Sequence, residues 1–142
     1  MSALRSAPRI VGVDYGSKRT GLAIADPLGL FARPLGTFAP GLATAELVKL
    51  DTREGVATIA LGWPLEPDGA EGSAVERVRS FEGRLKKALP HVSIVRIDER
   101  YSSAHASTRL HEAGASRRVR RDKGLVDAAA ACVILEDYLR ER

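Results

Sequence analysis

The order of the predicted elements indicates an α/β fold: a mixed sheet of five strands, three antiparallel and then two parallel, with helices on both faces. Two observations lead to this prediction. Three short β-rich segments come first and are separated by turn residues, so they can pair through hairpins. Helix and strand patterns then alternate, and a helix between two strands is the crossover that parallel strands require. The 142 residues suffice for one domain around one core.

The first half of the chain supplies four of the strands. Strands are predicted at residues 10–14, 20–25, 35–38 and 56–61, with a helix at 44–53 before the fourth. Gly16 and Ser17 form the turn of the first hairpin, because both residue types favour turns. Pro34 and Pro40 flank the third strand, which we therefore place toward an edge of the sheet. The fourth segment is almost entirely apolar, as expected of a buried strand.

The second half contributes three helices and the fifth strand. A loop at 62–72 contains Asp68 and Glu71, which have the residue types and spacing of a helix capping box. The helix that follows carries one apolar stripe, made of Val75, Val78, Phe81, Leu85 and Leu89. Beyond Pro90 we predict a strand at 92–97, a helix at about 103–113 and, after a basic loop, a last helix at 123–139 capped by Asp122.

Charge and composition narrow the classes of function. Lys and Arg number 22 against 18 Asp and Glu, a net charge of +4, and the run 117–123 alone holds five cations and one anion. The rest of the chain is neutral, with 17 charges of each sign, so the run indicates an anionic partner. The single cysteine, Cys132, excludes an internal disulfide and suits the cytoplasm. No stretch fits a membrane span, and we expect a flexible tail at 1–8 before one domain at 9–142.

Three acidic residues interrupt apolar patterns near a strand end or a helix start. Asp14 ends the first strand, and Asp127 stands in an otherwise apolar helix. Glu99 follows the fifth strand, on the face of Val95 and Ile97 if the strand extends that far. A charge near the core is costly unless it is paired or bound to a metal. Convergence of the three acids would suit Mg²⁺ or Mn²⁺, ions that cleave phosphodiesters in two-metal sites.

Each of these acids also has a structural interpretation: a turn hydrogen bond, an ion pair with a neighbouring arginine, or a contact between helices. Asp98 lies on the opposite strand face from Glu99 and shares that face with Arg96. A surface charge or a pair with Arg96 is the simpler interpretation of Asp98. It is nevertheless the alternative strand-end metal ligand if the predicted alternation is wrong.

Four ordered motifs resemble those of one family. They are the segments 12–23, 62–64 with 68–69, 98–103 and 123–130. In these motifs, from about residue 9 to 139, the chain resembles the YqgF/RuvX family of RNase H-like nucleases. The resemblance implies an RNase H-like fold and metal-dependent phosphodiester cleavage, with Asp14, Glu99 and Asp127 as the metal-binding, catalytic acids. It further implies processing of the 5′ end of precursor 16S rRNA, with Holliday junction resolution as the alternative.

Basic and aromatic residues near these motifs are candidates for nucleic-acid contacts. They are Lys18, Arg19, Trp63 and Arg100, together with Arg117, Arg118, Arg120, Arg121 and Lys123 of the basic run. Lys18 and Arg19 lie in the first turn, where charge also serves solubility. Trp63 is placed in a loop, where its ring can stack on an unpaired base or, as a residue at the rim, pack on Pro64. Arg100 can bind a phosphate or hold Glu99 in place.

Two other classes of function stay open at this point. The first turn also resembles the phosphate-binding hairpin of sugar kinases and chaperone-type ATPases, which close two such domains around ATP, whereas this chain has room for one. A nucleic-acid-binding protein without catalysis would keep the same fold and the same basic run. A junction resolvase needs two active sites and therefore a homodimer, whereas a single processing cut needs one site.

Overall fold

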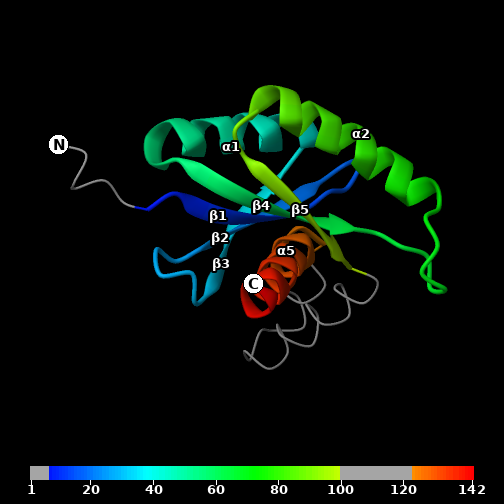
Figure 1. Cartoon of the computed structure of the whole chain (residues 1–142). Coiled ribbons are helices and arrows are strands. Elements are labelled where there is room, and N and C mark those ends of the chain that lie inside the picture. The colour runs from blue at the N-terminus through cyan, green and yellow to red at the C-terminus, as the bar shows by residue number, and fades with distance from the viewer. Residues whose placement is uncertain (1–6, 100–122) are drawn as a thin grey trace.

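The computed structural model describes residues 7–99 and 123–142, and for residues 123–127 it describes the backbone alone. Figure 1 shows the elements in these ranges, which are β1 (Arg9–Asp14), β2 (Thr20–Ala25), β3 (Ala32–Phe38), α1 (Pro40–Glu54), β4 (Val56–Trp63), α2 (Ser73–Ala88), β5 (Ser93–Asp98) and α5 (Lys123–Glu141). Most of the predicted tail, the helix predicted at about 103–113 and the basic run before Lys123 lie outside the described residues.

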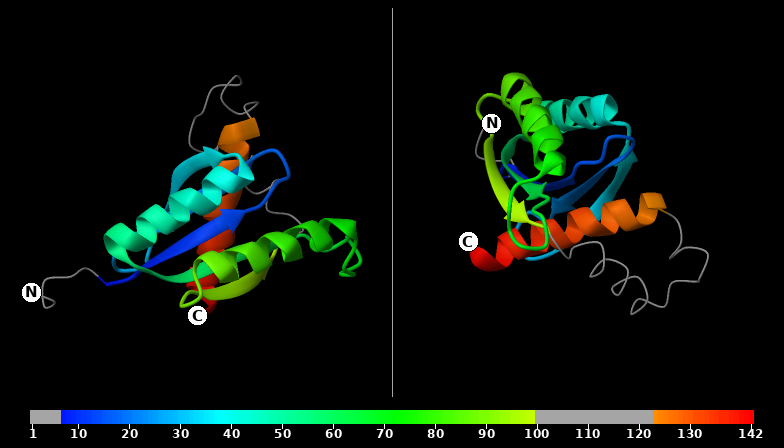
Figure 2. Two further views of the ribbon diagram at one scale, coloured as in Figure 1. Left: turned by 90° about the horizontal axis from the view of Figure 1, so that it is seen from above. Right: turned by 90° about the vertical axis from the view of Figure 1, so that its right-hand side faces the viewer.

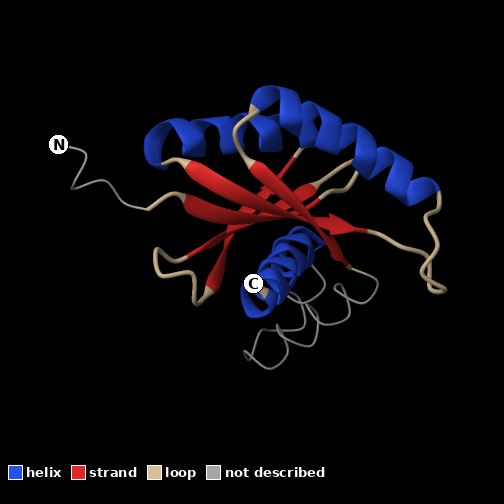
Figure 3. Ribbon diagram, viewed as in Figure 1, coloured by secondary structure: helices blue, strands red, loops and turns tan. Residues whose placement is uncertain are grey.

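The sheet has the predicted mixture of strand directions. Its strand order is β3-β2-β1-β4-β5. β2 pairs antiparallel with β1 and β3, while β4 pairs parallel with β1 and β5. Helices α1 and α2 cover one face and α5 covers the other, as Figure 3 shows. The five-stranded mixed sheet with helices on both faces is therefore confirmed, and so is the edge position of β3.

Small residues on one face of the sheet let α5 approach closely. Gly12 of β1, Ala23 of β2 and Ala60 of β4 lie on this face, while the large aliphatic residues that alternate with them face α1 and α2. A Cβ atom on Gly12 would lie 2.6 Å from the carbonyl oxygen of Ala131 in α5. The helix therefore rests directly on the backbone of β1 and crosses the sheet, as the two views of Figure 2 show.

The capping box predicted before α2 is wrong. The helix begins at Ser73 and has no side-chain cap. Asp68 instead accepts the backbone N–H of Ala70 at 2.9 Å, which closes a turn within the loop. Glu71 accepts the indole N–H of Trp63 at 3.0 Å, a contact that the local pattern could not reveal. Both carboxylates are thus engaged outside the helix terminus.

Most element boundaries agree with the predictions, and the differences have local causes. The apolar stripe of α2 is buried as predicted, with its five side chains at most 2% exposed. The third strand starts at Ala32 and includes Pro34, which its edge position allows. Helix α1 starts at Pro40. Proline is well tolerated in the first turn of a helix, because the N–H that it lacks would have no partner within the helix. Within the ranges described, no helix is both long and apolar enough to cross a bilayer.

Candidate active site

Two of the predicted acids meet at one end of the sheet. Strands β1, β4 and β5 run parallel, so their carboxyl ends lie at the same edge. Asp14 is the last residue of β1, Glu99 follows the last residue of β5, and both are half-buried. The Asp14 carboxylate lies close enough to Glu99 to share a hydrogen bond with it. The structure therefore brings these two acids together across the end of β4.

Glu99 continues the alternation of β5. Val95 and Ile97 pack with the residues of α5, and the residues that alternate with them, Ile94 and Arg96, lie on the side of α2. The Glu99 carboxyl lies on the α5 side, and its backbone N–H donates to the carbonyl oxygen of Trp63 at 3.2 Å. Asp98 is exposed. The predicted strand-face assignment is confirmed, and it favours Glu99 over Asp98 as the strand-end ligand.

Burial and neighbouring acids favour the protonated form of Glu99. Burial first, then the charge of Asp14, a hydrogen bond with Asp14 and the charge of Asp98 raise the pKa of the Glu99 carboxyl from 4.5 to about 10. Two carboxyl groups this close hold one proton between them when no cation is present. A divalent cation in place of that proton would neutralise both, and Mg²⁺ and Mn²⁺ prefer carboxylate oxygens. The pair therefore fits a divalent-metal site.

Asp127 lies in the N-terminal part of α5. At the far end of this helix, the Arg142 guanidinium donates to the carbonyl oxygen of Gly29 at 3.0 Å, in the turn between β2 and β3. That turn lies at the end of the sheet opposite Asp14. The N-terminal end of α5 therefore points toward Asp14, and Asp127 lies about one helical turn before the contact of α5 with Gly12.

The backbone of Asp127, the third predicted ligand, thus lies toward the end of the sheet that holds Asp14. Its side chain lies outside the described part of the chain. Among the side chains that are described, no three His, Cys, Asp or Glu residues form a group that could hold a metal ion. The role of Asp127 as a ligand therefore stays a prediction.

Two candidate cations lie in the turn that follows Asp14. Lys18 and Arg19 are exposed in the turn between β1 and β2, which begins directly after Asp14. Lys123 is the first residue of α5, and its side chain is outside the described part. Arg100 and the four arginines of the basic run also lie outside the described residues. Positive charge beside the acids is suited to phosphate contacts.

The placement of Trp63 in a loop is wrong. Trp63 is the last residue of β4, and its side chain is 5% exposed in the core beneath α2. The Arg96 guanidinium lies 3.9 Å from the ring centroid, and Arg96 also donates two hydrogen bonds of 2.9 Å to the buried Glu82 of α2. The indole N–H is taken by Glu71. A ring covered in this way cannot receive a base, so we remove Trp63 from the candidate contacts.

A comparison with protein families shows to which family the chain belongs. A sequence profile of RuvX, described as Holliday junction resolvase, matches residues 8–141. The chain belongs to the RuvX family. A relative from Salinibacter ruber is 50% identical over 98% of this chain and 97% of its own length, and one from Chlorobium luteolum is 46% identical over 94% of each. Both are named "Putative pre-16S rRNA nuclease". The predicted family and its nuclease class are confirmed.

Solved structures agree on the fold. RuvC of Thermus thermophilus in complex with a Holliday junction substrate matches with a TM-score of 0.55 and 16% identity, over 94% of this chain and 96% of that one. The Fowlpox virus resolvase, in complex with Holliday junction DNA, matches with a TM-score of 0.56 and 13% identity, over 93% and 97%. At these identities the match confirms the predicted RNase H-like fold alone.

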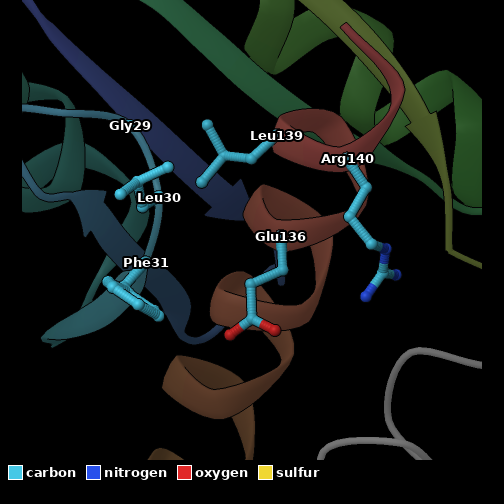
Figure 4. Close-up of a pocket in the computed structure, with 6 residues that line it drawn as sticks. All are labelled: Gly29, Leu30, Phe31, Glu136, Leu139 and Arg140. Atoms are coloured by element: carbon cyan, nitrogen blue, oxygen red, sulfur yellow. The ribbon is translucent and has the colours of Figure 1, made fainter.

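This RuvX-family protein also has a pocket that the motifs did not indicate. It has a volume of about 420 Å³ and lies between the β2–β3 turn and the C-terminal part of α5 (Figure 4), where it is lined by Gly29, Leu30, Phe31, Glu136, Leu139 and Arg140. Asp26 shapes the turn by accepting three backbone N–H groups, which lower the pKa of its carboxyl, the one from Phe31 most. The pocket is at the opposite end of the sheet from Asp14 and is separate from the acid pair.

Proposed function

We propose that this protein is a divalent-metal-dependent endonuclease that processes the 5′ end of precursor 16S rRNA. Its family membership and the names of its Salinibacter and Chlorobium relatives support this substrate. The observation that carries the chemistry is the acid pair at the carboxyl ends of β1 and β5, where burial and the charge of Asp14 favour a protonated Glu99. The single cysteine, Cys132, suits the reducing cytoplasm.

In this proposal Asp14, Glu99 and Asp127 hold Mg²⁺ or Mn²⁺. When bound, such ions supply a hydroxide nucleophile at neutral pH and stabilise the leaving oxygen. The chain's own part is to hold the ligands on rigid strand ends and a helix, and to release the proton that Asp14 and Glu99 share. Lys18 and Arg19, which are exposed in the turn after Asp14, orient the scissile phosphate. Arg100 and the basic run hold the flanking backbone.

A second candidate substrate is the Holliday junction. The family profile carries that description, and the fold is that of resolvases solved with junction DNA. A junction presents the same phosphate charge as RNA and differs in shape and in lacking the 2′-hydroxyl group. Two symmetric cuts require two active sites, so this candidate comes with a homodimer.

The test is a cleavage assay on a labelled precursor rRNA fragment, a four-way DNA junction and ATP, each with Mg²⁺, Mn²⁺ or EDTA. We expect metal-dependent cleavage of the rRNA fragment near the mature 5′ end. Preferential cleavage of the junction by a dimer would replace the first substrate by the second. Binding without cleavage under every condition, or ATP turnover without strand cleavage, would contradict the nuclease proposal.

The basic run makes a separate prediction about binding. If Arg117, Arg118, Arg120, Arg121 and Lys123 all contact phosphates, replacing them with Gln flattens the salt dependence of binding. The slope of log K against log salt should change by about 3.5 units for a single strand and about 4.5 units for a duplex. The measurement is fluorescence anisotropy of a labelled fragment across a salt series in EDTA.

A matched control removes the same charge from the helices α1 and α2. Lys49, Arg53, Arg84, Lys86 and Lys87 are exposed cations of α1 and α2. Their replacement with Gln should leave the slope close to the wild-type value. Equal slopes for both variants would show that the basic run does not hold the nucleic acid.

A further inference from the structure

Gly62 lies in β4, between β1, which ends at Asp14, and β5, which Glu99 follows. We infer that Gly62 is a positioning residue: its missing side chain creates the space in which the Glu99 carboxyl meets Asp14. This inference rests on the proposed function insofar as Glu99 is a metal ligand. Its structural part, the space over Gly62, depends on the geometry alone.

The space over Gly62 is filled by the Glu99 carboxyl. A Cβ atom on Gly62 would lie 1.9 Å from Oε2 and 2.9 Å from Cδ of Glu99, and 2.7 Å from Cδ1 of Ile134. Real Cβ atoms essentially never approach another heavy atom within 3.0 Å. Any side chain at this position would therefore displace the Glu99 carboxyl, the Ile134 side chain or both.

Backbone conformation does not explain this glycine. The described glycines with a positive φ are Gly29, Gly36, Gly55 and Gly69, and Gly62 is not among them. An L-residue could adopt the strand conformation of Gly62 without strain. The requirement for glycine at this position is therefore one of space.

The two displaced groups differ in their freedom to move. The Glu99 backbone is held by its N–H hydrogen bond to the carbonyl oxygen of Trp63, the residue next to Gly62. The Trp63 side chain is 5% exposed and is covered by Arg96, so this strand end is fixed. On the other side, Ile134 is fully buried in α5. A methyl group at position 62 would act mainly on the flexible carboxyl of Glu99.

Gly12 provides a contrast on the same face of the sheet. The three atoms nearest to a Cβ there all belong to α5, and they include the carbonyl oxygen of Ala131 at 2.6 Å and Cβ of Leu135 at 2.7 Å. Gly12 therefore allows helix packing, whereas Gly62 accommodates a carboxyl group. This difference makes Gly12→Ala the matched control for coupling to Glu99.

The first test is a double-mutant cycle of unfolding in urea and EDTA. All proteins carry Ile134→Val, which removes the Cδ1 atom, so that Glu99 is the closest remaining group. Gly62→Ala should destabilise the protein with Glu99 and cost much less when Glu99 is replaced by Ala. Gly12→Ala should cost the same in both backgrounds. An equal cost of Gly62→Ala in both backgrounds, or failure to fold in both, would overturn the inference.

The second test measures Mn²⁺ binding by calorimetry on folded proteins with Ile at position 134. Gly62→Ala should weaken Mn²⁺ binding by about 10- to 100-fold, the loss typical when a residue that orients a metal ligand is changed. Nucleic-acid affinity in EDTA should stay unchanged, and so should Mn²⁺ binding in Gly83→Ala, because nothing lies within 4 Å of that added Cβ. Equal Mn²⁺ affinity of Gly62→Ala and the wild type would overturn the positioning role.

The two tests separate this inference from the proposed function. A wild-type protein that binds no Mn²⁺ and cuts no nucleic acid would contradict the proposed function, and the unfolding cycle would then decide the role of Gly62 by itself. A wild-type protein that binds Mn²⁺ and cuts, with no coupling between positions 62 and 99, would contradict the inference and leave the proposed function standing.

Discussion

Asp14→Asn and Glu99→Gln are each expected to slow strand cleavage by more than about 100-fold, the upper end of the loss seen when only an outer partner of a metal ligand is removed. Each amide keeps the size of the acid and removes one negative charge from the site. The Asp14 and Glu99 side chains are in contact, so the loss of either charge weakens the site as a whole. The measurement is the single-turnover rate on the precursor rRNA fragment, with circular dichroism to establish folding.

Asp127→Asn should show the same loss, because its backbone lies toward the same end of the sheet. Asp98→Asn should retain most of the activity, since Asp98 is exposed and Glu99 occupies the face toward α5. Asp26→Asn is the matched control, as it makes the same chemical change at the opposite end of the sheet. Full activity in any two of the Asp14, Glu99 and Asp127 variants would show that these acids are not the catalytic set.

In the metal-free protein the same Glu99→Gln variant is expected to be more stable than the wild type at neutral pH. The pKa of Glu99 is raised above 4.5 in the folded state, so the folded protein binds the extra proton between that value and about 10. The stability that this bound proton contributes is fully present below pH 4.5. The free energy of unfolding then falls as the pH rises through this window, by at most about 1.4 kcal/mol per pH unit. The glutamine side chain keeps a hydrogen-bond donor for Asp14 and does not titrate.

Urea unfolding in EDTA, from about pH 5 to about pH 9, checks this prediction through the slope of the unfolding free energy against pH. The stability advantage of the Glu99→Gln variant over the wild type should grow with pH. Added Mg²⁺ or Mn²⁺ should reduce this advantage, because a ligand that binds only the folded wild type stabilises it by about 2.7 kcal/mol at about 100 times its dissociation constant. A stability difference between the two proteins that does not change with pH, or does not change with added metal, would contradict this role of the Glu99 proton.

Much of the fold followed from patterns within short segments. Alternating or uniformly apolar runs predicted the five strands, and the spacing of the stripe from Val75 to Leu89 predicted the buried face of α2. Turn residues and crossover order then predicted the strand directions. The alternation of β5 also placed Glu99 on the correct face. These properties depend on residues near one another in the chain, which is why the sequence was enough.

Other features depended on partners that lie outside the local pattern. Glu71 fits a capping box locally, but in the folded protein its carboxylate accepts hydrogen bonds from Trp63 and Arg79. Trp63 looked like a loop residue beside a proline, but Arg96 and α2 enclose its ring. Neither arrangement follows from the residues next to Glu71 or Trp63 in the chain.

The sequence by itself determined the order of the described elements and the family, and it singled out the three acids as candidate ligands. Only the tertiary structure decided that Asp14 and Glu99 share a site and that Gly62 has to be glycine. The physical reason is that a pKa and a steric clearance are set by whichever atoms lie within a few ångströms. For the Glu99 carboxyl those atoms come from β1, β4 and α5, which only the folded chain brings together.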